Sequence, residues 1–571
     1  MWDYDYVSLT DEQKLLRRAQ LDWAGYYVIL SQLLVGVLVG LYRNTSGGSG
    51  GGRLRRLMWK LYDPISLRYP KLRCWRDWLV VAAWTGWCMS LVVVNTGNDY
   101  FHLTKSLGTV AAANLPLHFL LAMKRSPLRW LFGLSYEGQA NFLHRWLGRI
   151  INLLLYTHAA LYLDFFWRAG KMNTRFLEGD VLCGVGAVGV LFAIGLSANH
   201  TIRHRWYRTF YLLHITLAPL LFPLLYLHVS HLRPYLLCSI FLFTVDQALK
   251  YHLRIQALAS ITTPSPGLLL ITGTLPSAPP TPPPPGSHCQ LLHAQSSFWG
   301  ANPFTILPSS SNSSGGGGKQ IRLIARVRGG TTRRLAALAL RTTANGRPVQ
   351  VTIDMPFGPT TPRLDSFDDV DNVLFIAGGV GATFAVGWVV RLLQLSTTSN
   401  REGEWGRGKV RFIWAVKSPA EAAWALEYPG VAGCVELFIT NPTGTAATSD
   451  VHGDEEGVEM TEGLLSSTAA TAGDGAGDGT GDGTADGALD ALVRLGLDRH
   501  RIERGRPNLA KMVGETVLRA GEGGGGSGGN GGSTAVMVCA PAAMAAVVKR
   551  AVARQGMHGR DVSIHVEEFG H

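Results

Sequence analysis

The chain has 571 residues, a net charge of +12 at pH 7 and a hydrophobic content of 47%. This length exceeds that of one domain, and long apolar runs in the first half exclude a wholly soluble protein. The charge indicates no nucleic-acid partner, because it forms no basic stripe with interleaved aromatic residues, and seven cysteines without CxxC spacing indicate neither a disulfide framework nor a zinc site.

The first half predicts an all-α membrane bundle of about seven helices. A polar, partly acidic tail over residues 1–22 precedes the first apolar run, so the start does not resemble a secretory signal. The runs that follow are each long enough to cross a hydrocarbon layer of about 30 Å. They cover residues 23–42, 77–94, 107–123, 142–166, 180–197, 208–228 and 235–250.

Arginines and lysines predict the orientation of this bundle. Basic residues from Arg43 to Arg76 fill the loop between the first two runs, and others lie near Lys124 and Arg203. These connections are therefore expected in the cytoplasm. With seven spans the tail 1–22 is then extracytoplasmic, and the C-terminal half is cytoplasmic.

Two apolar runs each carry two histidines fourteen residues apart, His144 with His158 and His214 with His228. On an α-helix this spacing is close to four turns, so both imidazoles lie on one face, about 21 Å apart along the axis. A lone histidine in an apolar helix is most often structural, but four at matched spacing in a membrane indicate ligands. Two such helices side by side would hold two stacked bis-histidine haems. Four further histidines lack a matched partner and are interpreted as structural or interfacial: His118, His200, His204 and His231.

The composition changes after Lys250, and the second half predicts two soluble domains. Strand-like runs separated by Pro- and Gly-rich loops predict an antiparallel β-barrel, at 268–272, 303–307, 321–327 and 349–356. From Asn372 strands alternate with helices, which predicts a doubly wound α/β domain with a parallel sheet. The predicted domains are a transmembrane haem-binding domain over 23–250, a barrel over 251–366 and an α/β domain over 367–571.

Four low-complexity segments interrupt these domains. They contain too few apolar residues to form a core, so each is expected to be a disordered surface loop. They cover residues 276–286, 309–318, about 443–488 and 521–533.

A glycine-rich segment at 375–386, FIAGGVGATFAV, follows one predicted strand and opens a helix. Its glycines would let the backbone approach a dinucleotide pyrophosphate, whose charge the helix N-terminus attracts. Taken alone this is a weak signal, since glycines at strand–helix junctions are also packing devices.

Together these motifs resemble the fungal ferric reductase and NADPH oxidase superfamily, and most closely its ferric/cupric metalloreductase branch. In the membrane half the resemblance rests on NLPLHFLLAMKRSPL (114–128), FLHRWLGR (142–149) and RHRWYRTF (203–210). In the soluble half it rests on ANPFTI (301–306), GGTTRRL (329–335), MPFGP (355–359), AGGVGAT (377–383), IWAVK (413–417), GRPNL (505–509), VCAP (538–541) and EEFGH (567–571). The sequence departs from the family pattern at Asn302, Met355, Ala540 and His571.

The resemblance implies a role for individual residues. Those beside the flavin ring would be Asn302, which takes the place of the family's histidine, with Pro303, Phe304 and Thr305. The flavin phosphates would contact Gly330 and Thr332, and Phe569 would cover the isoalloxazine face. Cys539 would lie near the nicotinamide. The rest of the NADPH would be bound by Gly378, Gly379, Gly381, Thr383, Lys417 and Arg506, the last two beside the 2′-phosphate.

The resemblance implies a multi-pass membrane oxidoreductase that uses NADPH, FAD and two b-type haems. Electrons would leave cytosolic NADPH, pass the His144/His214 site and then the His158/His228 site, and reach an acceptor outside. Three functions stay open: a metalloreductase of Fe(III) chelates or Cu(II) for metal uptake, a superoxide-generating oxidase that uses O₂, and an inactive membrane scaffold with degenerate flavin motifs. The expected location is the plasma membrane, with an internal membrane as the alternative and a metal permease as a candidate partner.

Overall fold

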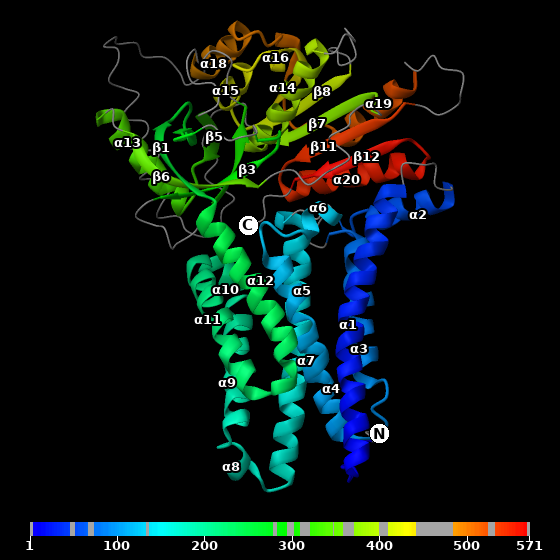
Figure 1. Cartoon of the computed structure of the whole chain (residues 1–571). Helices are drawn as coiled ribbons and strands as arrows, with labels where there is room; N and C mark the ends of the chain where they lie inside the picture. The colour runs from blue at the N-terminus through cyan, green and yellow to red at the C-terminus, as the bar shows by residue number, and fades with distance from the viewer. Residues whose placement is uncertain are drawn as a thin grey trace.

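The computed structural model contains a helical bundle, a β-barrel and an α/β domain, in that order along the chain (Figure 1). The residues that the structure describes are 4–45, 52–66, 73–132, 136–277, 283–293, 302–308, 320–345, 348–357, 370–398, 409–440, 483–522 and 532–567.

The bundle is built from helices of very different lengths. Its long members are α1 (Asp11–Thr45), α3 (Trp75–Val93), α4 (Tyr100–Ala113), α7 (Asn141–Arg168), α9 (Gly179–Ser197), α11 (Tyr207–His228) and α12 (Arg233–His252). Shorter helices join them: α2 (Gly52–Tyr62), α5 (Leu115–Ala122), α6 (Leu128–Phe132), α8 (Met172–Arg175) and α10 (His200–Arg205).

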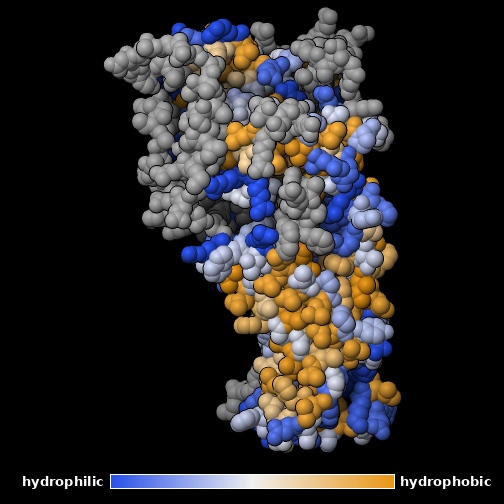
Figure 2. All heavy atoms as spheres, turned by 90° about the vertical axis from the view of Figure 1, so that its left-hand side faces the viewer, coloured by the Kyte–Doolittle hydropathy of each residue, from blue (hydrophilic) through white to orange (hydrophobic). Residues whose placement is uncertain are grey.

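Five helices in the described part of the chain are long and apolar enough to cross a membrane: Asp11–Leu41, Gly138–Arg168, Gly179–Ser197, Tyr207–His228 and Ser230–His252. On the face that Figure 2 shows, hydrophobic residues cover most of the helical half, with hydrophilic residues at the end away from the soluble domains. The two other predicted spans form helices as well. Residues 77–94 lie in α3, and residues 107–123 are divided between α4 and α5.

Asn114 causes this division, because it ends α4 and is followed by a proline within the first turn of α5. Its side chain is fully buried. Asn114 Nδ2 donates to the carbonyl of Val110 at 2.8 Å, and its Oδ1 accepts from Nε1 of Trp84 at 3.1 Å. The break between the helices is therefore a hydrogen-bonded feature, which a bilayer interior requires.

The N-terminal end of the bundle points away from the soluble domains, and α2 lies beside them (Figure 1). Arg550 of the α/β domain donates to Asp63 at 3.0 Å, immediately after α2. Arg125 pairs with Asp354 of the barrel at 2.6 Å, and both side chains are largely buried. The tail and the C-terminal half thus lie at opposite ends of the bundle, as the predicted orientation requires.

Six antiparallel strands close into a barrel in the order β1-β2-β5-β4-β3-β6. Leu335 and Ala339 of α13 (Thr331–Asn345), one turn apart, pack into the barrel core. The strands are β1 (Arg254–Thr262), β2 (Leu268–Thr274), β3 (His288–His293), β4 (Asn302–Leu307), β5 (Gln320–Arg326) and β6 (Val349–Phe357). The sequence patterns predicted four of these, and β1 and β3 are additional.

The α/β domain contains a six-stranded parallel sheet in the order β10-β9-β8-β7-β11-β12. Its middle strands are buried on both faces, since α14 (Ala382–Thr398) covers one face and α19 (Leu509–Glu522) and α20 (Ala542–Met557) cover the other. The doubly wound fold is confirmed. The strands are β7 (Asn372–Gly378), β8 (Val410–Val416), β9 (Val435–Ile439), β10 (Ile502–Arg504), β11 (Thr534–Cys539) and β12 (Val562–Val566).

Most of the four low-complexity segments, 278–282, 309–318, 443–482 and 523–531, lie outside the described residues. One boundary is corrected, because α18 (Gly483–Arg494) begins inside the predicted loop 443–488. Leu492 of this helix is fully buried against the α/β core, and this apolar contact stabilises the helix.

Candidate functional site

The four matched histidines converge in two pairs from α7 and α11. The ring centroids of His144 and His214 lie 6.3 Å apart, and those of His158 and His228 lie 6.5 Å apart. A metal ion bonded to two imidazoles at about 2 Å each places their ring centroids roughly 6 Å apart. Each pair is therefore spaced to hold one iron atom between its rings.

The hydrogen bonds of these rings also suit iron ligation. Nδ1 of His158 lies 2.7 Å from the carbonyl of Thr104, and Nδ1 of His228 lies 2.7 Å from that of Asp180. Nδ1 of His144 lies 3.1 Å from a carbonyl of α5. A proton donated from Nδ1 to a carbonyl leaves Nε2 free to bind a metal and makes the ligand more basic. Nδ1 of His214 is buried and has no partner among the described residues.

Two glycines make room for the rings of the outer pair, His158 and His228. A Cβ built on Gly184 of α9 would lie 2.6 Å from Cε1 of His228, and one on Gly108 of α4 would lie 3.1 Å from Cε1 of His158. Helices α4 and α9 can approach these rings so closely because neither position carries a side chain.

The sequence predicts that His158 and His228 ligate a haem, and on that prediction alanine at Gly184 should weaken haem binding at the outer pair. The new methyl group would displace His228 from its contact with Asp180, and loss of such a supporting contact typically lowers metal affinity about 10- to 100-fold. The measurement is the haem-to-protein ratio of the purified variant. Gly189→Ala on the same helix is the matched control, because a Cβ there meets no atom within 4 Å, and it should retain full haem. Equal ratios in both variants would contradict the placement of His228 at this site.

The predicted glycine loop meets the VCAP segment at the carboxyl edge of the parallel sheet. A Cβ on Gly381 would lie 2.1 Å from the carbonyl oxygen of Cys539, and one on Gly378 would lie 2.6 Å from Cδ of Pro541. Gly379 has a φ of +54°, in the left-handed region, and its carbonyl accepts from Nε1 of Trp414 at 2.8 Å. Two motifs far apart in the sequence are thus packed backbone to backbone.

Cys539 ends β11 and is 2% exposed. Burial, together with the nearby Glu567 carboxylate, raises the pKa of the Cys539 thiol well above its usual value. The thiol is therefore neutral at physiological pH and is no nucleophile. Thr383 is also buried, and its hydroxyl donates to the carbonyl of Val380 at 2.9 Å, so it stabilises the glycine turn.

Lys417 and Arg506 lie at the same edge of the sheet. Lys417 follows β8 directly, and Arg506 lies two residues beyond β10; both are exposed. Between them, the backbone N–H of Gly505 donates to the carbonyl of Ile439 at the end of β9, at 2.8 Å. Two cations thus lie on the side of the sheet where dinucleotides bind in doubly wound folds.

The candidate flavin residues on β4 divide between the two faces of the strand. Phe304 lies in the barrel core, whereas Leu307 packs into the core of the α/β domain. By strand alternation Pro303 and Thr305 share the face of Leu307, between the two domains. The side chain of Asn302 and the whole of Phe569 lie outside the described residues.

The candidate phosphate site lies at the N-terminus of α13. Gly330 has a φ of +68° in the turn before this helix. The Thr332 hydroxyl accepts from the backbone N–H of Arg328 at 2.9 Å, which closes the turn. The N–H groups of a helix N-terminus and its dipole attract phosphate, so this end of α13 has the geometry that flavin phosphates need.

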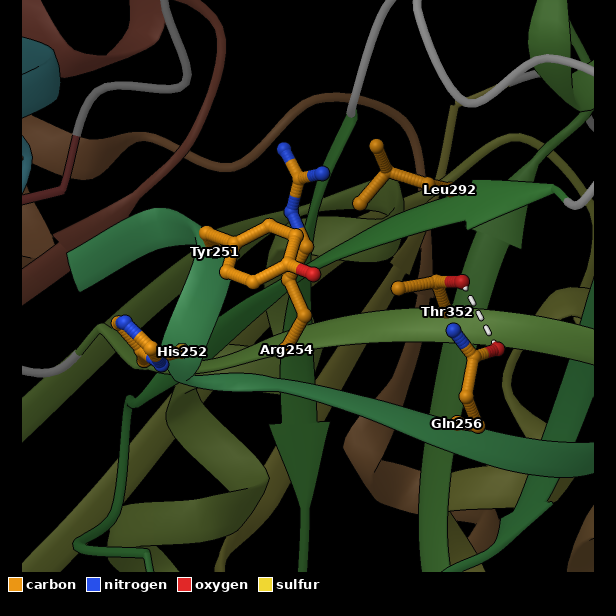
Figure 3. Close-up of a pocket in the computed structure, with 6 residues that line it drawn as sticks. All are labelled: Tyr251, His252, Arg254, Gln256, Leu292 and Thr352. Carbon is orange, nitrogen blue, oxygen red and sulfur yellow. Dashed lines mark hydrogen bonds between the residues drawn. The ribbon is translucent and has the colours of Figure 1, made fainter. Parts of the chain in front are cut away.

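A pocket of about 460 Å³ lies at the junction of α12 with β1, β3 and β6 (Figure 3). Thr352 donates to Gln256 at 3.0 Å within it. None of the predicted cofactor residues lines this pocket, so it is separate from the candidate flavin residues on β4. Its lining residues are Tyr251, His252, Arg254, Gln256, Leu292 and Thr352.

Sequence reasoning missed several residues of these sites. Gly108 and Gly184 carry no signal in the sequence, since glycines are frequent in apolar helices. His118 was set apart from the matched pairs, yet its ring stacks on that of His144 with centroids 4.0 Å apart. Its stacking partner lies on another helix, so spacing along the sequence gives no sign of the contact.

Three family models match the chain in sequence order. They are a ferric reductase like transmembrane component over residues 107–225, an FAD-binding domain over 268–361 and a ferric reductase NAD binding domain over 370–553. The matched ranges contain His144, His158 and His214, the β4 strand and the glycine loop, and His228 lies three residues beyond the first range.

Individual relatives extend this similarity. The chain is 26% identical to ferric reductase transmembrane component 3 of Saccharomyces cerevisiae, over 52% of this chain and 41% of the relative. It is 26% identical to ferric/cupric reductase transmembrane component 2 of the same yeast, over 54% and 42%. It is 27% identical to a probable metalloreductase of Yarrowia lipolytica, over 68% of each chain. The match thus spans less than half the length of the two Saccharomyces proteins. The resemblance seen in the motifs is confirmed: the chain matches, in order, a ferric reductase like transmembrane component, an FAD-binding domain and a ferric reductase NAD binding domain.

Proposed function

We propose that this chain is an NADPH-dependent metalloreductase that carries electrons from the cytosol across a membrane. Its cofactors would be FAD and two b-type haems, and its acceptor an extracytoplasmic Fe(III) chelate or Cu(II) ion. The observation that supports this most is the spacing of the two imidazole pairs. Their ring centroids lie 6.3 and 6.5 Å apart, which suits one iron atom between each pair, and the pairs lie at two depths of one bundle.

When bound, FAD accepts a hydride and releases electrons one at a time, and each haem iron alternates between the ferric and ferrous states. The chain itself would hold the cofactors at fixed positions. His144 and His214 would hold one iron near the cytoplasmic side, and His158 and His228 would hold the other about 21 Å along the helix axis. The apolar helices around them exclude water and ions.

At the cytoplasmic end the α/β domain would bind and orient the dinucleotide. The glycine turn at Gly379 allows close approach of a pyrophosphate to backbone N–H groups. Lys417 and Arg506 would pair with a 2′-phosphate, which supports NADPH over NADH. The neutral thiol of Cys539 lies beside this turn and adds no negative charge next to the dinucleotide that the turn would bind.

The names of the relatives support a metal as the acceptor, since they are ferric, ferric/cupric and metalloreductases. Metal uptake supports the plasma membrane as the location and a metal permease as a partner. A superoxide-generating oxidase uses the same groups up to the outer haem and differs only in the acceptor. An inactive scaffold would bind none of these cofactors.

The test uses the full chain in sealed vesicles, with NADPH on the side of the soluble domains and a ferric chelate on the other side. Fe(II) is trapped with ferrozine, with and without superoxide dismutase. We expect Fe(II) to form at the same rate in both samples. A signal abolished by dismutase would instead identify an oxidase, and a preparation without haem and flavin absorption would identify a scaffold.

A further inference from the structure

His118 lies in contact with one of the candidate haem ligands, although it belongs to neither matched pair. Its ring is stacked on the ring of His144, with centroids 4.0 Å apart and planes inclined by only 15°. The carbonyl oxygen of the same residue lies 3.1 Å from Nδ1 of His144. One residue of α5 therefore contacts both the face and the edge of the ligand ring.

The position of His118 is itself fixed by the break between α4 and α5. Its backbone N–H donates to the carbonyl of Asn114 at 3.0 Å, so it occupies the first full turn after the buried junction. On the other side, a Cβ on Gly148 of α7 would lie 3.0 Å from Cε1 of His118. The ring thus fits between α5 and α7 because position 148 carries no side chain.

The polar edge of His118 is also unusual for a structural residue. Its Nδ1 is buried and has no hydrogen-bond partner among the described residues. An unsatisfied buried nitrogen is unfavourable, and packing alone does not explain it. The outer site shows the contrast: His158 also bonds a backbone carbonyl, but the residue that provides it is Thr104, which has no ring to stack.

We propose that His118 is a positioning residue of the inner haem site, and that it sets the reduction potential of the iron bound by His144. Its ring fixes the plane of the ligand imidazole, and this keeps the ligand's Nδ1 aligned with the carbonyl of residue 118. That hydrogen bond makes the ligand more basic, and a more basic ligand favours ferric over ferrous iron. His118 thereby lowers the potential of the inner haem relative to a site without the stack. This proposal rests on the proposed haem ligation.

The test uses the full chain with His158→Ala, so that the inner haem is the one measured, and compares residue 118 as His, Ala and Phe. Redox titration gives the midpoint potential, and electron paramagnetic resonance of the ferric haem reports the orientation of the ligand planes. We expect H118A to shift the potential upward and to change the largest g-value. H118F should stay near the parent in g-value, because a flat ring can still stack.

An H118A variant with the parent's potential and g-values would overturn the proposal. If H118A does not retain the haem, the H118F variant tests the proposal instead. Retained haem with the parent's g-value supports the stacking role of residue 118, and a lost or altered signal contradicts it. Absence of haem in the parent chain, by contrast, would refute the proposed function itself. The two failures are therefore distinguishable.

Discussion

Replacing His158 by alanine should remove one haem from the chain and lower acceptor reduction across the membrane by more than about 100-fold. Loss of a residue that merely supports a metal ligand already costs about 10- to 100-fold, and this change removes the ligand itself. Reduction of the flavin by NADPH should be unaffected, because that step takes place in the soluble domains at the other end. The measurements are Fe(II) production across sealed vesicles and anaerobic bleaching of flavin absorption by NADPH.

His200→Ala is the control for this variant, since His200 is an exposed histidine of α10 outside both pairs. It should retain both haems and full transfer. Transfer at the normal rate in His158→Ala would show that electrons do not pass this site. A loss of flavin bleaching as well would show that the variant is misfolded rather than interrupted at one step.

Alanine at Gly381 should destabilise the α/β domain and impair binding of the dinucleotide. Its Cβ would lie 2.1 Å from the carbonyl oxygen of Cys539. This neighbour is backbone at the end of the buried strand β11, and it cannot move aside as a flexible side chain can. Overpacking of this kind costs about 1–3 kcal/mol or more. We expect a lower midpoint of thermal unfolding and a rise of more than about 10-fold in the KM for NADPH.

Gly487→Ala provides the comparison within the same domain. Position 487 is exposed on α18, and a Cβ there meets no atom within 4 Å. Alanine at an exposed helical position is favoured over glycine by up to about 1 kcal/mol, so this variant should be as stable as the parent or slightly more so. A Gly381→Ala protein with normal stability and normal KM would show that the glycine loop is not packed against β11 as described.

The sequence predicts the elements whose signal is local. The runs of α7, α9 and α11 are long and apolar enough to cross a membrane, and the 14-residue spacing of histidines on α7 and α11 specifies one helix face. Strands β7, β8 and β11 are buried on both faces and therefore appear as continuous apolar runs. The glycine loop is visible because a strand precedes it and a helix follows.

Features that depend on neighbouring elements cannot be predicted in this way. β1 follows the last membrane helix without a turn signal, and two of its buried residues, Ala257 and Ala259, are too small to mark a buried face. The break at Asn114 depends on Trp84 of another helix. The close contacts of Gly184 and Gly381 depend on rings and carbonyls that are distant in sequence. His118 belongs to this group, because its stacking partner lies on α7.

The central claim is that two pairs of imidazoles each hold a haem iron, and the haem content of the chain tests it most directly. The measurement is the ratio of haem, determined as its pyridine complex, to protein in the purified full-length chain, together with the absorption bands of low-spin iron. The account predicts two haems per chain with the spectrum of bis-histidine ligation. One haem, no haem or a high-spin spectrum would contradict it.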